Sequence, residues 1–459
     1  MPASLLSRLR ALPERLLHNP LLRRVARNSG VLFSAGTAAA LLSMGQSALS
    51  ARMLGVAGFG VLGVITQFAT VVNGLTSFRM SQLVVTYVSK YAADGDDARA
   101  AAVFKAAGLV EIAGSLVAYG LLAALAPWAA RAFAPHDPGL TPLYLLYGLI
   151  IVANLMVESS TGLLQVFNRF GTIGSITVTQ SAATLALIAV AWLAGGGLAA
   201  VLLAYLAGKT LWALLTIGAA LREAMRRWGR GWWRAPLGLL AGQRRELISF
   251  AVNTNLTATL NLVTRDSELL WLSLFGDERQ VGYYKVALAV RNLLVNPVEP
   301  LISTTYREVS REIVGRRWAN VRYLLRSSSL IAAAWTVPAA LGLALLGRWA
   351  IARVWGPDFA PAYVSLMILL AGVAAVNIFF WNRNVLLPLG LPGVPTRVHL
   401  AAALLKVAGI FAVVPRWGAN GMAFLLSAFY LGTVGALVWK SLLELRRAEA
   451  RAPEPAAGG

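Results

Sequence analysis

Long apolar runs, separated by short polar joints, make up most of the chain. Twelve of these runs are long enough for a transmembrane helix, which needs about 20 predominantly apolar residues. They lie near residues 30–50, 59–78, 103–126, 141–164, 172–193, 198–220, 248–274, 281–304, 327–346, 361–382, 397–414 and 419–439. Because helices and closed barrels are the structures that can cross lipid, the pattern predicts an all-α polytopic membrane protein with twelve transmembrane helices.

Three short features of the first half of the chain recur in the second half. Gly55 is matched by Gly276, Trp128 by Trp349 and Gly197 by Gly418, and the same distance along the chain separates each pair. Six helices per copy is an even number, so both copies would start on the same side of the membrane. We therefore expect two parallel six-helix repeats around a central cavity, an architecture that favours an alternating-access transporter over a channel.

This architecture divides the chain into five segments. They are a basic amphipathic segment at 1–28, a first six-helix lobe at 29–221, a basic cytoplasmic linker at 222–246, a second six-helix lobe at 247–440 and a cytoplasmic tail at 441–459. The first segment lacks the compact apolar core of a signal peptide. Leucine and arginine alternate in it, which suits either a helix on the anionic inner leaflet or a solvated basic linker. The 222–246 linker combines seven arginines with three tryptophans, which favours a helix lying on that leaflet.

Composition and charge narrow the class of protein. Hydrophobic residues make up 58% and charged residues 13% of the chain, whereas soluble domains carry about 25% charged residues. The chain has no cysteine, and its three histidines (His18, His136 and His399) share no metal-ligand spacing. Most of the 41 Lys and Arg fall in the two terminal segments and in every second joint. This positive-inside pattern places both termini in the cytoplasm and gives no support for a nucleic-acid partner.

Polar side chains recur along one face of several predicted helices. On the seventh helix they are Asn253, Thr257, Asn261, Thr264 and Glu268, and on the eighth Lys285, Asn292, Asn296 and Glu299. The fourth helix carries Asn154, Glu158, Thr161 and Gln165, and the second carries Thr66, Thr70, Asn73 and Ser77. Spacings of three and four residues put each set on one face. Lipid cannot satisfy these groups, so they should face a wet cavity or each other, although the hydroxyls of the second helix could equally serve packing.

Charged residues at membrane depth point to the same cavity. A Lys, Arg or Asp at the centre of a helix costs about 2.5–3.5 kcal/mol, so such residues need a partner or water. Lys209, Arg291 and Lys406 lie near the middle of their predicted helices. Arg265 next to Asp266 fits a local ion pair as well as a ligand contact. Two prolines flank Glu299 and should bend the eighth helix, either as a hinge or as a static kink.

Three segments resemble Wzx-type polysaccharide-export flippases. They are Ser50-Ala51-Arg52-Met53-Leu54-Gly55-Val56-Ala57-Gly58-Phe59-Gly60, Val281-Gly282-Tyr283-Tyr284-Lys285-Val286-Ala287 and Trp355-Gly356-Pro357-Asp358-Phe359-Ala360-Pro361-Ala362. One departure is that Asp266 lies one place before, and Glu268 after, the position where such proteins often carry an Asp in the seventh helix. The resemblance implies the multidrug/oligosaccharidyl-lipid/polysaccharide exporter superfamily, with two lobes around a V-shaped cavity in the bacterial inner membrane.

The resemblance also implies a substrate, undecaprenyl-diphosphate-linked oligosaccharide, which such proteins move from the inner to the outer leaflet. The residues expected to contact it in the cavity are Lys209, Arg265, Arg291, Lys406, Asn253, Thr257, Asn261, Asn292 and Asn296. The residues expected to couple transport to a proton or sodium gradient are Glu158, Glu268 and Glu299. No catalytic residue, metal or cofactor is expected. The expected partners are the lipid-linked oligosaccharide and membrane lipids, with a monomeric state and a possible association with a polysaccharide polymerase.

Three other functions fit the sequence less well. A cation-coupled multidrug antiporter of the same fold would favour acidic residues at depth, whereas here acids and bases are balanced. A major-facilitator transporter would carry a Gly-xxx-Asp-Arg motif after the second helix, but residues 90–99 do not match it. A membrane enzyme would need converging acid–base groups, and the predicted external segments 127–140 and 347–360 offer only His136, Asp137 and Asp358.

Overall fold

The structure, a computed structural model, describes residues 20–76, 80–133, 138–251, 262, 267–383, 385–391 and 393–450. All regular elements within these ranges are helical. Seven of the described helices are long and apolar enough to cross a membrane. This part of the chain therefore confirms the predicted all-α class.

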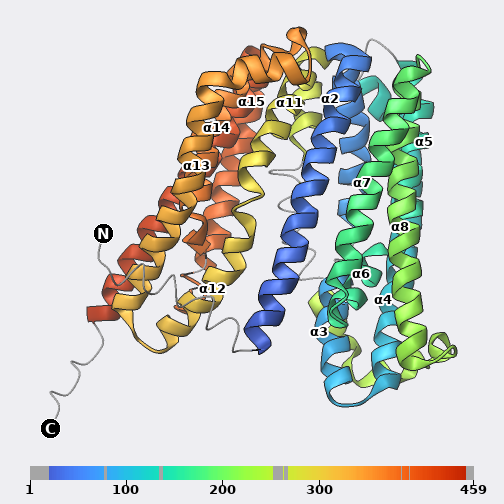
Figure 1. Cartoon of the computed structure of the whole chain (residues 1–459), viewed down its shortest axis with the longest axis vertical. Coiled ribbons are helices and arrows are strands. Elements are labelled where there is room, and N and C mark those ends of the chain that lie inside the picture. The colour runs from blue at the N-terminus through green and yellow to red at the C-terminus, as the bar shows by residue number, and fades with distance from the viewer. Residues whose placement is uncertain are drawn as a thin grey trace.

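Two groups of helices stand side by side (Figure 1). The first comprises α2 (Pro20–Thr76), α3 (Met80–Ala93), α4 (Asp97–Phe133), α5 (Thr141–Ala153), α6 (Val157–Val166), α7 (Phe170–Leu193) and α8 (Leu198–Trp228). The second comprises α10 (Glu268–Phe275), α11 (Glu278–Val295), α12 (Glu299–Val314), α13 (Trp318–Val354), α14 (Ala362–Ile378) and α15 (Gly393–Ala450). Short 3₁₀ segments join them: η1 (Pro138–Leu140), η2 (Trp232–Arg234), η3 (Leu237–Gln243), η5 (Pro357–Phe359) and η6 (Phe380–Arg383). The described start of α2 and the end of α15 lie at one end of the molecule, which we call the terminal end (Figure 1).

Breaks in the long helices fall at glycine and near proline. The backbone is not helical at Gly55 in α2 (φ 67°) or at Gly418 in α15 (φ 53°), so each of these elements consists of two helices joined at a glycine. A positive φ strains any residue with a side-chain Cβ, which explains why glycine occupies both joints. The predicted bend of the eighth helix is confirmed, because α11 ends at Val295 and α12 begins at Glu299.

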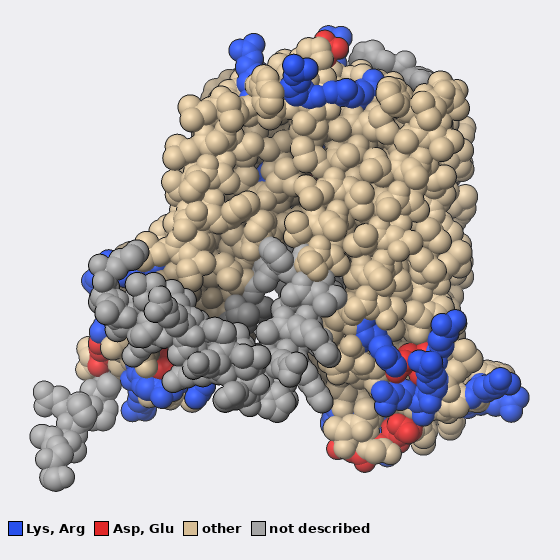
Figure 2. Space-filling model, in the orientation of Figure 1, with Lys and Arg blue, Asp and Glu red and all other residues tan. Residues whose placement is uncertain are grey.

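Large apolar side chains on the outside of the bundle identify the protein as multi-pass. Leu193, Leu345 and Leu405 are 82%, 83% and 74% exposed. Exposing such large apolar side chains to water is unfavourable, and contact with lipid removes that cost. Figure 2 shows a broad middle belt almost free of charged residues, with Lys and Arg gathered toward the two ends. This belt has the character of a surface that faces hydrocarbon.

The two groups of helices touch at the end opposite the terminal end. A Cβ on Gly60 of α2 would lie 1.9 Å from the Glu278 carbonyl oxygen, and one on Gly282 of α11 would lie 2.3 Å from the Val56 carbonyl oxygen. No residue larger than glycine fits at either position without moving the backbone. The backbones of α2 and α11 are therefore in direct contact here, and we call this the closed end.

Side chains reinforce the closed end from both groups. The rings of Phe59 and Phe359 meet edge to face, with centroids 5.8 Å apart. The Arg52 guanidinium donates from Nε to the Val354 carbonyl oxygen at 3.0 Å, and from Nη2 to the carbonyl oxygen of Arg353. These carbonyls belong to the last turn of α13, where a positive charge is favourable.

The basic linker differs from the surface helix expected over 222–246. Residues up to Trp228 are the last turns of α8, and the segment continues as η2 and η3. Two of its tryptophans turn inward, because the rings of Trp228 and Trp232 lie 6.1 and 5.2 Å from that of Phe104. Trp233 is 55% exposed. Two of the three rings therefore pack against α4, a contact that the sequence could not reveal.

Candidate functional site

A cavity of about 240 Å³ lies between the two groups of helices, below the closed end. It is lined by Gln67, Thr70, Glu268, Leu269, Leu288, Arg291 and Asn292. These residues come from α2, α10 and α11, the helices that approach each other across the two groups. We call this the interlobe cavity. Gln67 is seven residues from Gly60, which places the cavity about two helical turns from the glycine contact.

A buried ion pair forms one wall of the interlobe cavity. The Lys406 ammonium group of α15 pairs with Oε1 of Glu268, and both side chains are nearly inaccessible. The Tyr284 hydroxyl donates to the other carboxylate oxygen of Glu268 at 2.7 Å. Both charges are thus compensated, as burial in a low dielectric requires. Removing either partner would leave the other charge buried in apolar surroundings without compensation.

Arg291 is the cationic residue in the described lining of the interlobe cavity. Its Nη2 donates to Oδ1 of the neighbouring Asn292 at 2.8 Å, and its Nη1 lies 3.5 Å from the Tyr430 hydroxyl. Among the described residues no carboxylate forms an ion pair with it. A guanidinium held by neutral groups keeps its charge and its planar donor fork for an anionic ligand.

The structure brings together only part of the predicted site. Glu268, Arg291, Asn292 and Lys406 meet at the interlobe cavity. Asn296 caps the carboxyl end of α11, one turn beyond Asn292. Lys209 lies in α8 of the first group, with its Nζ 5.4 Å from the centre of the Trp212 ring. Asn253, Thr257, Asn261 and Arg265 lie outside the described residues, and so does the side chain of Glu299 at the start of α12.

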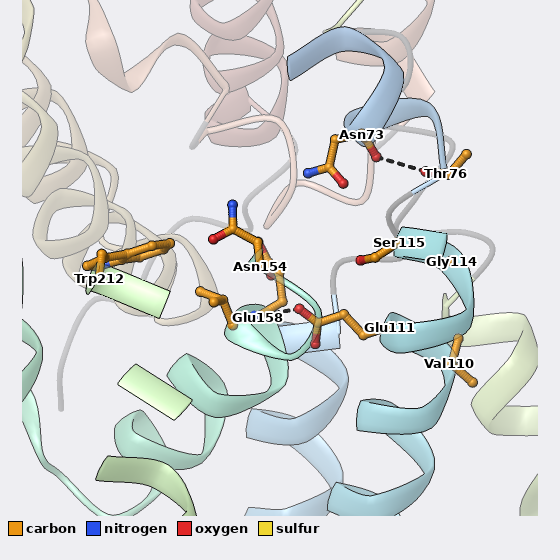
Figure 3. Close-up of a pocket in the computed structure, with 10 residues that line it drawn as sticks. Asn73, Thr76, Val110, Glu111, Gly114, Ser115, Asn154, Glu158 and Trp212 are labelled. Atoms are coloured by element: carbon orange, nitrogen blue, oxygen red, sulfur yellow. Dashed lines mark hydrogen bonds between the residues drawn. The ribbon is translucent and has the colours of Figure 1, made fainter. Parts of the chain in front are cut away.

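Glu158 lies in a second cavity, inside the first group of helices (Figure 3). We call it the first-lobe cavity; its volume is about 180 Å³. It is lined by Asn73, Thr76, Val110, Glu111, Gly114, Ser115, Asn154, Val157, Glu158 and Trp212. It forms where the chain leaves α5 and starts α6, so the fourth apolar run is broken at this depth.

Sequence reasoning missed Glu111, which faces Glu158 across this break. The Glu111 carboxylate accepts hydrogen bonds from the backbone N–H groups of Glu158 at 2.7 Å and Ser159 at 2.9 Å, and from the Ser159 hydroxyl at 2.6 Å. The signal was present, because Glu111 is an acidic residue inside the apolar run 103–126. Its partner could not be read from the sequence, since the two are 47 residues apart.

The two groups of helices have the fold of solved membrane transporters of the MOP superfamily. The structure of the lipid II flippase MurJ in an inward closed conformation superposes with a TM-score of 0.68 at 14% identity, covering 92% of this chain and 90% of that one. An inward-facing multidrug resistance MATE family transporter of the MOP superfamily gives 0.67 at 12% identity, covering 90% and 96%. At these identities the likeness establishes the fold.

The family follows from the sequence. Residues 25–306 match the family described as "Polysaccharide biosynthesis protein", which is more than half of the chain, and the chain belongs to that family. It is also 23% identical over 343 residues to the inner membrane protein YghQ of Escherichia coli (strain K12), covering 74% of this chain and 95% of that protein. The predicted resemblance to polysaccharide exporters is thereby confirmed.

Proposed function

We propose that this protein is a flippase that moves undecaprenyl-diphosphate-linked oligosaccharide from the cytoplasmic to the outer leaflet. The observation that carries the proposal is the Arg291 guanidinium, which is hydrogen-bonded to neutral side chains and lines a cavity between the two groups of helices. Membership of a polysaccharide biosynthesis family supports a glycan substrate. The structural likeness to a lipid II flippase supports a lipid-linked one.

The physical chemistry of this substrate fits the interlobe cavity. A sugar-diphosphate head group is too polar for hydrocarbon, whereas its polyprenyl tail can remain in lipid. Arg291 would bind the diphosphate through its fork, and Gln67, Thr70 and Asn292 would form hydrogen bonds with hydroxyl groups. Lys406 would act indirectly in this scheme, because its charge is committed to Glu268.

The proposal includes a topology. The twelve-helix plan with two parallel repeats follows when α2 and α15 are each divided at their glycine, and when the second part of α2 with α3, α5 with α6 and α11 with α12 each count as one span. In this plan the terminal end faces the cytoplasm. Arg226 and Arg227 in the last turn of α8 and Arg316 before α13 support this orientation. The closed end would then face outward, so the structure represents a state that receives substrate from the cytoplasmic leaflet of the bacterial inner membrane. A proton or sodium gradient would drive the cycle in a monomer, with a polysaccharide polymerase as the partner downstream.

A lipid-flipping assay in liposomes tests the function. Fluorescent undecaprenyl-diphosphate oligosaccharide starts in one leaflet, and its accessibility to a lectin quencher reports transfer. We expect Arg291→Gln to slow transfer about tenfold or more, since a charge-assisted hydrogen bond contributes about 1.5–3 kcal/mol. Arg348→Gln, an exposed arginine of α13, is the matched control and should transfer at the normal rate.

Two results would contradict the proposal. Normal transfer by folded Arg291→Gln would remove Arg291 from the substrate site. Absence of lipid transfer, together with gradient-driven movement of a small organic cation, would favour the alternative function, a cation-coupled multidrug antiporter of the same fold.

A further inference from the structure

A lysine that the proposed substrate contacts leave unused joins the two groups of helices. The Nζ atom of Lys285 on α11 lies 4.1 Å from the centre of the Phe59 ring of α2, a cation–π contact. Phe59 is fully buried and packs edge to face on Phe359 at the closed end. Figure 1 shows α2 and α11 next to each other at this end. The Lys285 ammonium group therefore lies at the boundary that must separate if the closed end opens.

The Lys285 stem packs against the backbone of α2. A Cβ on Gly63 would lie 2.9 Å from Cδ of Lys285, so a larger residue at position 63 would push against the stem. Phe59 directly precedes Gly60, and Lys285 follows Gly282 by three residues, which is about one helical turn. The cation–π contact thus lies beside the contact between Gly60 and Gly282, and it holds the same two helices together.

No acidic residue compensates this charge. Among the residues that the structure describes, no Asp or Glu forms an ion pair with Lys285, and its cation–π contact is with Phe59. Glu268 of the adjacent helix α10 is committed, because Lys406 pairs with one of its carboxylate oxygens and the Tyr284 hydroxyl donates to the other. A lysine within a membrane-spanning bundle needs a partner, and an aromatic face is a weaker partner than an anion. An anion that reached Lys285 would therefore displace the Phe59 ring.

The interlobe cavity is within reach of this ammonium group. Leu288 and Asn292 line the cavity, and they follow Lys285 by three and seven residues, so all three lie on one face of α11. Leu288 is about 4.5 Å further along the helix axis. The flexible four-carbon stem of lysine can turn the ammonium group through that distance without a movement of the backbone. Lys285 can thus contact either the Phe59 ring or a ligand in the cavity.

We propose that Lys285 makes opening of the closed end depend on a bound diphosphate. The inference rests on the proposed function, because the ligand is the diphosphate of the lipid-linked oligosaccharide. Such a diphosphate carries a negative charge on each phosphate, and Arg291 can neutralise one of them. Lys285 would leave the Phe59 ring for the other phosphate and so release α2 from α11. The empty protein then stays closed, and the loaded protein opens.

Two substitutions separate the charge of Lys285 from its packing. Lys285→Met keeps an apolar stem of similar length against Gly63 and Phe59 but has no charge for a phosphate. We therefore expect it to remain closed with or without a diphosphate. Lys285→Arg keeps the charge and should respond as the wild-type protein does. Lys440→Met is the control, because Lys440 pairs with Glu444 in the last part of α15, at the terminal end, and it should also respond normally.

Spin labels on both groups of helices measure the opening, since the chain has no cysteine of its own. Ala194→Cys and Arg416→Cys place labels at exposed positions of the closed end, one in each group. Double electron–electron resonance follows their separation in purified full-length protein in nanodiscs, with and without saturating farnesyl diphosphate. Radioactive farnesyl diphosphate measures binding in parallel. We expect the diphosphate to raise the ratio of open to closed protein about fivefold or more in the wild type and in Lys285→Arg, and not in Lys285→Met.

The outcomes distinguish this inference from the proposed function. If farnesyl diphosphate binds to the wild type without opening it, or opens Lys285→Met to the same extent, the coupling role of Lys285 is wrong and the substrate site stands. No binding of farnesyl diphosphate at all would refute the diphosphate site of the proposed function, and the coupling role with it.

Phe59→Leu decides the result if Lys285→Met fails to fold. This variant removes the ring that competes for the Lys285 ammonium group, so it should bind farnesyl diphosphate about two- to fivefold more tightly than the wild type. It should also have a larger open fraction without ligand. Binding no tighter than that of the wild type would overturn the competition between the ring and the diphosphate.

Discussion

The contact between Gly60 and Gly282 makes a sharp prediction about the closed end. In Gly60→Ala the new Cβ would lie 1.9 Å from the Glu278 carbonyl oxygen, whereas real Cβ contacts shorter than 3.0 Å are essentially absent. The backbones of α2 and α11 would therefore have to separate by about 1 Å, and backbone cannot yield by changing rotamer. Overpacking of this kind costs about 1–3 kcal/mol. Because the cost falls on the closed state, the equilibrium should shift about 5- to 150-fold toward a state in which this end is open.

Cysteine accessibility measures this shift directly, since the chain has no cysteine of its own. Thr70→Cys places a thiol on the wall of the interlobe cavity, and a membrane-impermeant maleimide is added from the proposed outer side. We expect slow labelling in this background and faster labelling when Gly60→Ala is added. Gly36→Ala is the matched control within α2, because a Cβ at Gly36 meets no atom within 4 Å.

Labelling of the Gly60→Ala protein at the background rate, with normal folding and membrane insertion, would refute the reasoning. It would mean that α2 and α11 can separate without opening the end of the cavity. Fast labelling in the Gly36→Ala control would also count against it, since the effect would then belong to helix α2 in general.

Two further predictions concern charged groups. Glu268→Gln leaves Lys406 buried without its partner and should lower the free energy of unfolding by about 3–5 kcal/mol, whereas the double variant Glu268→Gln/Lys406→Met should regain much of that loss. Thermal unfolding in detergent compares the wild-type protein with the two variants. A double variant as unstable as the single one would contradict the ion pair. Arg52→Gln removes the donors to the last turn of α13 and should destabilise the closed end by about 0.5–1.5 kcal/mol. The Thr70→Cys labelling assay would detect this change as a faster reaction from the proposed outer side. Arg348→Gln should have no effect, and equal labelling of both variants would show that Arg52 does not stabilise the closed end.

The sequence was sufficient for the class of fold and for the family. The apolar runs predicted at 172–193 and 198–220 correspond to α7 and the membrane-spanning part of α8, because a run of that length has one stable conformation in lipid. The bend near Glu299 also followed from local chemistry, since proline removes a backbone donor wherever it occurs. These features depend on residues close together in the chain.

The site was predictable only in part, because it depends on which helix faces meet. Spacing placed Glu268 and Lys406 on their own helices, but they are 138 residues apart and nothing in the sequence paired them. Lys209 carries the same kind of signal as Lys406, yet it lies beside Trp212 in the first group. Glu111 went unrecognised because its role depends on the amino end of α6, which exists only where the fourth apolar run breaks.

The segment of α2 from Val56 to Thr76 links the features that matter for transport. Its first turns form the glycine contact at the closed end, its middle lines the interlobe cavity beside Arg291, and its last turns line the first-lobe cavity. A helix hydrogen-bonded along this length moves largely as one body, so a displacement at one of the three places is transmitted to the other two. A displacement of α2 at the first-lobe cavity should therefore change maleimide labelling at Thr70→Cys even in the absence of substrate.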